Sequence, residues 1–274
     1  MTFGVDDILP VLMFSAHNLL YFWCALMAVL LLYLSVRFKL QQKYFYIVRH
    51  GETLLNKEHI KQGQEGSLSE KGKMQALQVG KALVDHHIQK IYTSPYERAL
   101  ETAHLMQESL GCPIQTLDLL RERKNASEVL GKKTDDPEVI QISGLTAYGY
   151  HEDTYRYSDE ENFVDLFERA RDCARFLSRI PENKVVVVTH HAFLQMFLSY
   201  LLYRDTLHAE DYVKLSFYNP AENAGITLCV YHPWHGIYSK TKGWEIITYS
   251  QPLEFTRAIV TDPTSEKAPV RADS

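Results

Sequence analysis

Residues 43–53 read KYFYIVRHGET, and residues 185–191 read VVVVTHH. In both stretches a short apolar run stops at polar residues, Arg49-His50-Gly51 in the first and Thr189-His190-His191 in the second. Apolar runs of this length are typical of strands buried in a parallel sheet. Because open α/β sheets bind ligands at the carboxyl ends of their strands, we expect these polar residues to meet at one site.

The rest of the chain continues as an alternation of helical and strand patterns. Apolar residues at helical spacing predict four helices, with approximate limits 67–84, 94–110, 162–180 and 192–203. Ser94-Pro95-Tyr96-Glu97 is typical of a helix start with a capping serine. Strands are expected at 90–93 and, as a final pair, at 224–231 and 244–249. This alternation predicts an α/β fold of three layers, in which helices cover both faces of a mostly parallel sheet.

Charge divides the chain into two unequal parts. No charged residue lies between Asp7 and Arg37, whereas the remainder is mixed in charge. Residues 43–255 are predicted to form one domain, and the polar, proline-containing residues 260–274 a disordered tail. The segment 125–161 shows little periodicity and is expected to be an insertion over one face of that domain.

The uncharged part contains an apolar run, because residues 19–36 read LLYFWCALMAVLLLYLSV. In a helix this run would cover about 27 Å of a hydrocarbon layer of about 30 Å. We therefore expect a membrane anchor within residues 1–40, with a transmembrane helix at about 15–36. The alternatives are a cleaved signal peptide, which the acidic Asp6 and Asp7 disfavour, and a helix buried in the core.

The flanks of the apolar run predict the orientation of such an anchor. Arg37, Lys39 and Lys43 follow the run and no basic residue precedes it, so the positive-inside rule places the following domain in the cytoplasm. The four cysteines form no CxxC pair and no disulfide-like framework, which agrees with reduced thiols. The sequence thus predicts a single-pass membrane protein with a cytoplasmic domain.

Three polar clusters fall at the ends of predicted strands: residues 49–56, 94–98 and 189–191. Clusters at the carboxyl ends of parallel strands converge in space. The planar guanidinium groups of Arg49 and Arg98 match the oxygens of a phosphate group. A histidine kept neutral among them can attack phosphorus, as nucleophilic histidines do. We therefore expect a site for a phosphorylated small molecule.

Charge and spacing exclude other classes of ligand. With 29 basic and 34 acidic residues the net charge is −5, whereas a general nucleic-acid binder would be basic. The 12 histidines lack a matching pattern of carboxylates or cysteines, so a zinc site has little support. No metal and no cofactor are expected, and the sequence leaves the oligomeric state open.

Four motifs occur in order along residues 44–249 and closely resemble the histidine phosphatase superfamily, also called phosphoglycerate mutase-like. They are Arg49-His50-Gly51-Glu52-Thr53 after a strand, Leu68-Ser69-Glu70-Lys71-Gly72 at a helix start, Ser94-Pro95 with Arg98-Ala99 and Thr102-Ala103, and the valine run that ends at Thr189-His190. An RHG tripeptide alone would be weak support, but the ordered set is specific.

The resemblance implies roles for individual residues. It makes His50 the nucleophile that forms a phosphohistidine, and it assigns the phosphoryl oxygens to Arg49, Arg98 and His190. Leu120-Arg121-Glu122 matches the pattern that supplies a proton to the leaving oxygen, which makes Glu122 the candidate acid. Positions expected to bind substrate are Gly51, Thr53, Asn56, Gln62 and Gly63, while His191 either contacts substrate or packs.

Two departures from the family pattern leave alternatives open. A glycine often follows the acid, whereas here Arg123-Lys124-Asn125-Ala126 follow Glu122, and His190 is followed by His191 in place of glycine. Thr53-Leu54-Leu55-Asn56 lacks the Ser-x-Trp-Asn pattern of the mutases, which favours a phosphomonoester hydrolase. The alternatives are phosphotransfer of the phosphoglycerate mutase type, and a membrane-tethered module that binds phosphate without turnover.

Overall fold

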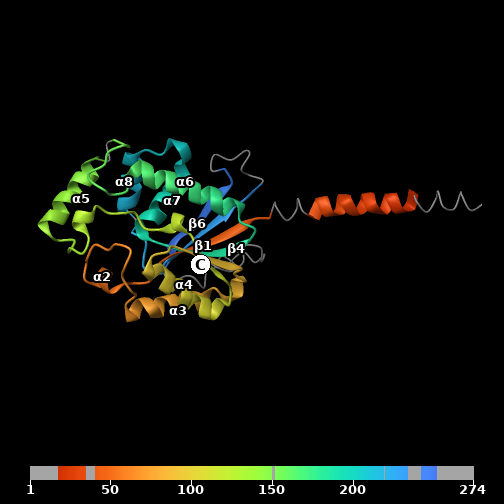
Figure 1. The fold of residues 1–274 in the computed structure, drawn as a ribbon, viewed down its shortest axis with the longest axis horizontal. Helices are drawn as coiled ribbons and strands as arrows, with labels where there is room; N and C mark the ends of the chain where they lie inside the picture. The colour runs from red at the N-terminus through yellow and green to blue at the C-terminus, as the bar shows by residue number, and fades with distance from the viewer. Residues whose placement is uncertain (1–17, 35–40, 150–151, 219, 234–241, 252–274) are drawn as a thin grey trace, which may run out of the picture. The chain divides into compact units, whose positions relative to one another are not determined.

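The computed structural model describes residues 18–34, 41–149, 152–218, 220–233 and 242–251 (Figure 1). The chain divides into two compact units between Gln41 and Gln42. The predicted tail at 260–274 lies outside the described residues.

The first unit contains one described helix, at residues 18–34. Across the described parts of the chain, no helix combines the length and the apolar character that crossing a bilayer requires. The predicted transmembrane helix at 15–36, whose ends lie outside the described residues, and the membrane placement derived from it are therefore not supported.

The second unit is built on a six-stranded sheet with the order β3-β2-β4-β1-β5-β6. Its strands are β1 (Lys43–Arg49), β2 (Lys90–Thr93), β3 (Ile114–Thr116), β4 (Lys184–Thr189), β5 (Ile226–Tyr231) and β6 (Trp244–Gln251). The first four run parallel, and β5 and β6 are antiparallel to their neighbours. The predicted mostly parallel α/β sheet is confirmed, with a short edge strand, β3, that the sequence pattern did not indicate.

Helices cover both faces of this sheet (Figure 1). The helices of this unit are α2 (Leu54–Lys57), α3 (Glu70–Ala82), α4 (Glu97–Leu110), α5 (Pro137–Gly149), α6 (Phe163–Arg179), α7 (His191–Tyr203) and α8 (Ala209–Tyr218). Of these, α3 and α4 cover one face, and α6, α7 and α8 cover the other. Side chains of β1 alternate between two cores: Tyr46 and Val48 pack with α3 and α4, whereas Phe45 and Ile47 pack with α6, α7 and α8. This alternation follows from the period of two along a strand, and it confirms the three layers.

Serine residues were predicted to begin two helices, and the structure confirms one of these two helix starts. Ser69 caps α3 as expected, because its hydroxyl accepts a hydrogen bond from the backbone N–H of Gly72. Ser94 does not cap α4, which begins after Tyr96 without a side-chain cap. The prediction for Ser94 was wrong because α4 begins only at Glu97. The Ser94 hydroxyl accepts a hydrogen bond from the backbone N–H of Tyr96 at 3.2 Å, before the helix, and lies 2.8 Å from Nε2 of His190.

The segment 125–161 contains a helix that the sequence analysis did not detect. Val139 and Ile142 of α5 are buried with Ala126 and Val129 in a small separate cluster. Ile140 on the same helix is 58% exposed, so apolar residues do not form one stripe. Without that stripe the helical period is weak, and the helix was missed.

Two glycines bring the loop after β1 against the first turn of α3. A Cβ on Gly51 would lie 2.5 Å from the carbonyl oxygen of Gly72, and a Cβ on Gly72 would lie 2.0 Å from the carbonyl oxygen of Glu52. Neither approach leaves room for a side chain. The backbone that follows His50 is therefore fixed by contact with a helix.

Gly72→Ala is expected to lower the free energy of unfolding by about 1–3 kcal/mol, because the added methyl group would overpack this contact. Gly144→Ala in α5 is the matched control, since nothing lies within 4 Å of the corresponding Cβ there. Denaturant titration measures both variants. Equal stability of the two variants would contradict the tight contact.

Candidate active site

The register of the central strands brings three chain segments to one edge of the sheet. Arg49 on β1 pairs with Thr189 on β4, and Val188 pairs with Thr93 on β2. The next backbone N–H groups continue this pairing, because that of His50 donates to the carbonyl oxygen of Thr189 at 2.9 Å and that of Ser94 donates to the carbonyl oxygen of Val188 at 3.0 Å. The residues that follow β1, β2 and β4 therefore lie side by side, as predicted.

His50 and His190 face each other at this edge, with ring centroids 5.1 Å apart. Both residues are buried. Nδ1 of His50 lies 2.8 Å from the carbonyl oxygen of Gly51. Because a carbonyl oxygen only accepts, this contact places the proton of a neutral His50 on Nδ1 and leaves a lone pair on Nε2.

The environment keeps both imidazoles neutral. Burial lowers the pKa of His50 well below its usual 6.5, and the nearby charges of Arg98 and Arg49 lower it further. Burial likewise lowers the pKa of His190 well below 6.5, with Arg98 and His50 adding to the effect. The site therefore holds two uncharged histidines beside two guanidinium groups at neutral pH.

The two arginines are held by backbone oxygens on the outer sides of the site. Arg98 is buried and donates to the carbonyl oxygen of Gly63 at 2.9 Å, and its guanidinium lies over the ring of Tyr96 at 5.2 Å. Arg49 donates to the carbonyl oxygen of Ala221. Within the described part of the chain, the buried Nε atoms of both arginines have no hydrogen-bond partner. Unpaired buried donors of this kind are costly and suit an oxyanion ligand.

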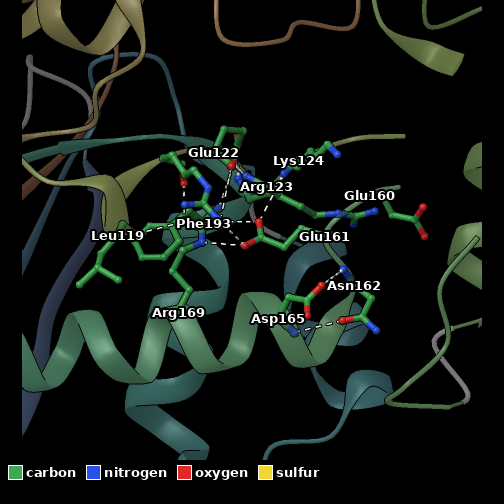
Figure 2. A network of polar contacts seen from close by, with 12 residues as sticks. Leu119, Glu122, Arg123, Lys124, Glu160, Glu161, Asn162, Asp165, Arg169 and Phe193 are labelled. Carbon is green, nitrogen blue, oxygen red and sulfur yellow. Dashed lines mark hydrogen bonds and ion pairs between the residues drawn. The ribbon is translucent and has the colours of Figure 1, made fainter. Parts of the chain in front are cut away.

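The side chain of Glu122, which comes from the loop after Leu120, lies at the amino end of α7. This helix begins directly after His190. Oε1 of Glu122 accepts a hydrogen bond from the backbone N–H of Phe193 at 3.0 Å, and its Oε2 accepts one from that of Ala192 at 3.3 Å. The first N–H groups of a helix lack partners within the helix and favour a negative charge. Glu122 thus binds two N–H groups at the amino end of α7, whose N-cap residue is His190. Figure 2 draws Glu122 together with Phe193 of this helix.

These residues surround a cavity of about 240 Å³. It is lined by Arg49, His50, Leu55, Asn56, His59, Ile60, Lys61, Gln62, Arg98, Glu122, Asn125 and Thr134. A larger cavity of about 750 Å³ adjoins it and shares Gln62, Glu122 and Asn125. Four of the five residues predicted to be catalytic therefore line one cavity, and His190 stands against His50.

The residues predicted to bind substrate divide into two groups. Asn56 and Gln62 line the smaller cavity, and Gly63 lines the larger one. Thr53 is buried behind them, where it caps α2 with Asn56 and donates to Oε1 of Gln62 at 3.1 Å. Gly51 packs on Gly72, as described above.

His191 is the first residue of α7 and is not among the residues that line either cavity. Burial lowers its pKa, the charge of Arg49 lowers it further, and Glu122 acts in the opposite direction. The structure thus places His191 beside the arginine, away from the cavity walls.

The lining residues of the smaller cavity that sequence reasoning missed include His59 and Lys61. They lie between Asn56 and Gln62, so their position in that loop was the one available signal. Asn125 and Thr134 also line it, and they come from the segment predicted to be an insertion. Among the side chains that the structure describes, no group of three or more histidines, cysteines or carboxylates is placed to hold a metal ion.

The fold and the site define a class of α/β protein in which a buried histidine pair and two arginines form an anion pocket at the carboxyl ends of parallel strands. Residues 45–238 match the family model of the histidine phosphatase superfamily, branch 1. Because this match covers more than half of the chain, the protein belongs to that superfamily.

Individual relatives include both mutases and phosphatases. The chain is 31% identical over 159 residues to "Probable phosphoglycerate mutase GpmB" of Erwinia tasmaniensis, a match that covers 57% of this chain and 74% of that protein. It is 28% identical over 179 residues to a "Probable phosphatase" of Schizosaccharomyces pombe, which covers 61% of this chain and 82% of that protein.

Solved structures agree on the fold. A mycobacterial glucosyl-3-phosphoglycerate phosphatase superposes with a TM-score of 0.63 at 22% identity, over 77% of this chain and 100% of that one. At this identity the likeness concerns the fold alone.

The buried neutral histidines give a prediction for stability against pH. In the unfolded chain they take up protons as the pH falls below about 6.5, whereas in the folded chain they do not. The unfolded state then binds more protons, so the free energy of unfolding falls as the pH decreases from 7 to 5, by up to about 1.4 kcal/mol per pH unit for each histidine.

Denaturant titrations across this pH range measure the effect. His50→Gln is expected to have a shallower dependence on pH, and His104→Gln, at an exposed position, should match the unsubstituted protein. An unchanged slope in His50→Gln would mean that His50 is protonated in the folded state.

Proposed function

We propose that the protein hydrolyses phosphomonoesters of small molecules through a phosphohistidine on His50. The observation that carries this proposal is the placement of a neutral, buried His50 in one cavity with two arginines. The contact of Nδ1 with Gly51 supports Nε2 as the attacking atom.

In the first step the lone pair of Nε2 attacks phosphorus, and the bond between phosphorus and the ester oxygen breaks. Arg49, Arg98 and His190 stabilise the charge on the phosphoryl oxygens. Glu122, in its acid form, gives a proton to the leaving oxygen, so that the product leaves as an alcohol.

In the second step water hydrolyses the phosphoenzyme. The Glu122 carboxylate takes a proton from the attacking water, the oxygen bonds to phosphorus, and the bond between phosphorus and Nε2 breaks. Inorganic phosphate leaves, and His50 and the acid form of Glu122 are restored. We propose that no metal ion takes part, because the cationic side chains already offset the phosphate charge.

His50→Ala is expected to lower phosphatase activity by at least about 10³-fold, because no other residue replaces the nucleophile. His104→Ala is the control for loss of an exposed histidine on α4. The measurement is phosphate release from a panel of phosphomonoesters, with and without a chelator.

Labelled phosphate should be trapped on His50 in an acid-labile, alkali-stable form. Label on a serine, threonine or cysteine would contradict the mechanism. An isomerised phosphoester without free phosphate would identify a mutase, and binding without turnover would identify a phosphate-binding module.

The charges of the smaller cavity support a narrower substrate class. Arg49, Arg98 and Lys61 supply three cations and Glu122 one carboxylate among the lining residues. When Glu122 is in the acid form that the first step requires, the two arginines balance a phosphate dianion, and the charge of Lys61 is left without an anion. Burial lowers the pKa of Lys61 and the charge of Arg123 lowers it further, so a nearby anion would stabilise the ammonium group. We therefore propose that the substrate carries a second anionic group, as phosphoglycerate does.

Lys61→Met is expected to lower kcat/KM for phosphoglycerate by about 10-fold relative to glycerol phosphate, since a charge-assisted contact is worth about 1.5 kcal/mol or more. Lys57→Met, at an exposed position on α2, is the matched control. Steady-state kinetics on both esters provide the comparison. An equal effect of Lys61→Met on the two esters would rule out a second anionic group at Lys61.

A further inference from the structure

Glu122 lies on a stretch of irregular backbone. It follows a short 3-10 turn at Asp118–Leu120 and precedes another at Ser127–Val129. Residues 121–126 belong to neither a helix nor a strand, so the hydrogen bonds of regular secondary structure do not hold their backbone in place. The orientation of Glu122 must therefore depend on groups from other parts of the chain.

Four consecutive backbone carbonyl oxygens around Glu122 accept hydrogen bonds from only two side chains, Arg169 on α6 and Thr189 on β4. Arg169 donates to Leu119 at 3.0 Å, to Arg121 at 2.6 Å and to Glu122 at 3.4 Å, and the hydroxyl of Thr189 donates to Leu120 at 2.8 Å. Figure 2 shows the guanidinium of Arg169 directed at this stretch of backbone.

Glu161 completes the arrangement from the other side. Its Oε1 accepts from Nε of Arg169 at 2.7 Å and its Oε2 accepts from Nη2 at 2.5 Å, with both side chains buried. The backbone N–H of Glu161 donates to the carbonyl oxygen of Lys124 at 3.0 Å, and Oε2 accepts from the N–H of Lys124 at 3.3 Å. The backbone is thus held before and after Glu122.

The chemistry of Arg169 suits this task. A guanidinium has five N–H donors in a rigid plane, and Arg169 makes five hydrogen bonds, three to backbone oxygens and two to Glu161. Its guanidinium also lies 4.6 Å from the centre of the Phe193 ring, on the helix whose N–H groups bind the Glu122 carboxylate. A lysine could not make these contacts together.

Buried ion pairs contribute little net stability, because desolvation of the two charges offsets their attraction. The geometry that this pair imposes is a more direct reason for its presence. We infer that the Arg169–Glu161 pair positions Glu122 for proton transfer to the leaving oxygen. This inference rests on the proposed role of Glu122 as the proton donor.

The experiment compares esters that differ in their need for a proton. Glycerol phosphate has a poor leaving group that needs an acid, whereas dinitrophenyl phosphate has a good one that does not. Glu161→Gln is expected to lower kcat/KM for glycerol phosphate by about 10- to 100-fold, part of what general acid catalysis contributes. For dinitrophenyl phosphate, whose leaving group needs no proton, kcat/KM is expected to fall by less than about 3-fold.

Arg169→Lys is the second variant. Lysine keeps a buried cation opposite Glu161 but cannot donate hydrogen bonds to all three carbonyl oxygens that Arg169 binds. We therefore expect kcat/KM of this variant to depend on the leaving group in the same way. Should Glu161→Gln fail to fold, Arg169→Lys decides the test. Glu182→Gln is the matched control, because it breaks the partly buried ion pair with Lys90 at the amino end of β2, where Nζ and Oε1 are 3.2 Å apart. This control should affect both esters equally.

Glu122→Gln is measured in parallel, to distinguish the proposed role of Glu122 as proton donor from the positioning role of the Arg169–Glu161 pair. If it shows no dependence on the leaving group, the proposed proton donor is wrong. If Glu122→Gln shows the dependence while Glu161→Gln or Arg169→Lys lowers kcat/KM equally for both esters, the pair is structural and the positioning inference is overturned.

Discussion

The parallel pairing of β1 with β4 is the constraint on which the site depends. It sets Arg49 opposite Thr189, and so the two strands end at one level with His50 and His190 beside each other. Burial at this level is costly for charged imidazoles, and the adjacent guanidinium groups add to that cost. The strand register therefore decides both where the histidines lie and in which protonation state they are held.

The amino end of α7 is the second feature that sets the geometry of the site, because it positions both His190 and the carboxylate of Glu122. His190 occupies the N-cap, and the carboxylate of Glu122 accepts from the N–H groups of the first turn. One helix end thus fixes the distance between a histidine and a carboxylate that are 68 residues apart in the sequence. A shift of α7 would move both groups together and change their placement relative to His50.

Sequence patterns predicted the parts of the molecule that local rules determine. The valine run, the Ser69 cap and the polar residues after the strands predicted the central sheet, α3 and the cluster of histidines and arginines. Ser94 was misassigned because α4 begins only at Glu97, and the Ser94 hydroxyl contacts the N–H of Tyr96 and Nε2 of His190 before the helix. Lys61 was indicated only by its place in the loop between Asn56 and Gln62, with no motif of its own. The support of Glu122 by Arg169 joins residues whose proximity only the folded chain shows.

The position of Glu161 in the chain has a consequence for protein engineering. The segment 125–161 contributes Asn125 and Thr134 to the cavity wall, and its last residue is the carboxylate that holds Arg169. Replacing this segment with one from another family member, in order to change the cavity wall, would also exchange the carboxylate that holds Arg169 beside the backbone of Glu122. A graft that aims to alter selectivity while preserving turnover should therefore end before Glu161 or restore a carboxylate at that position.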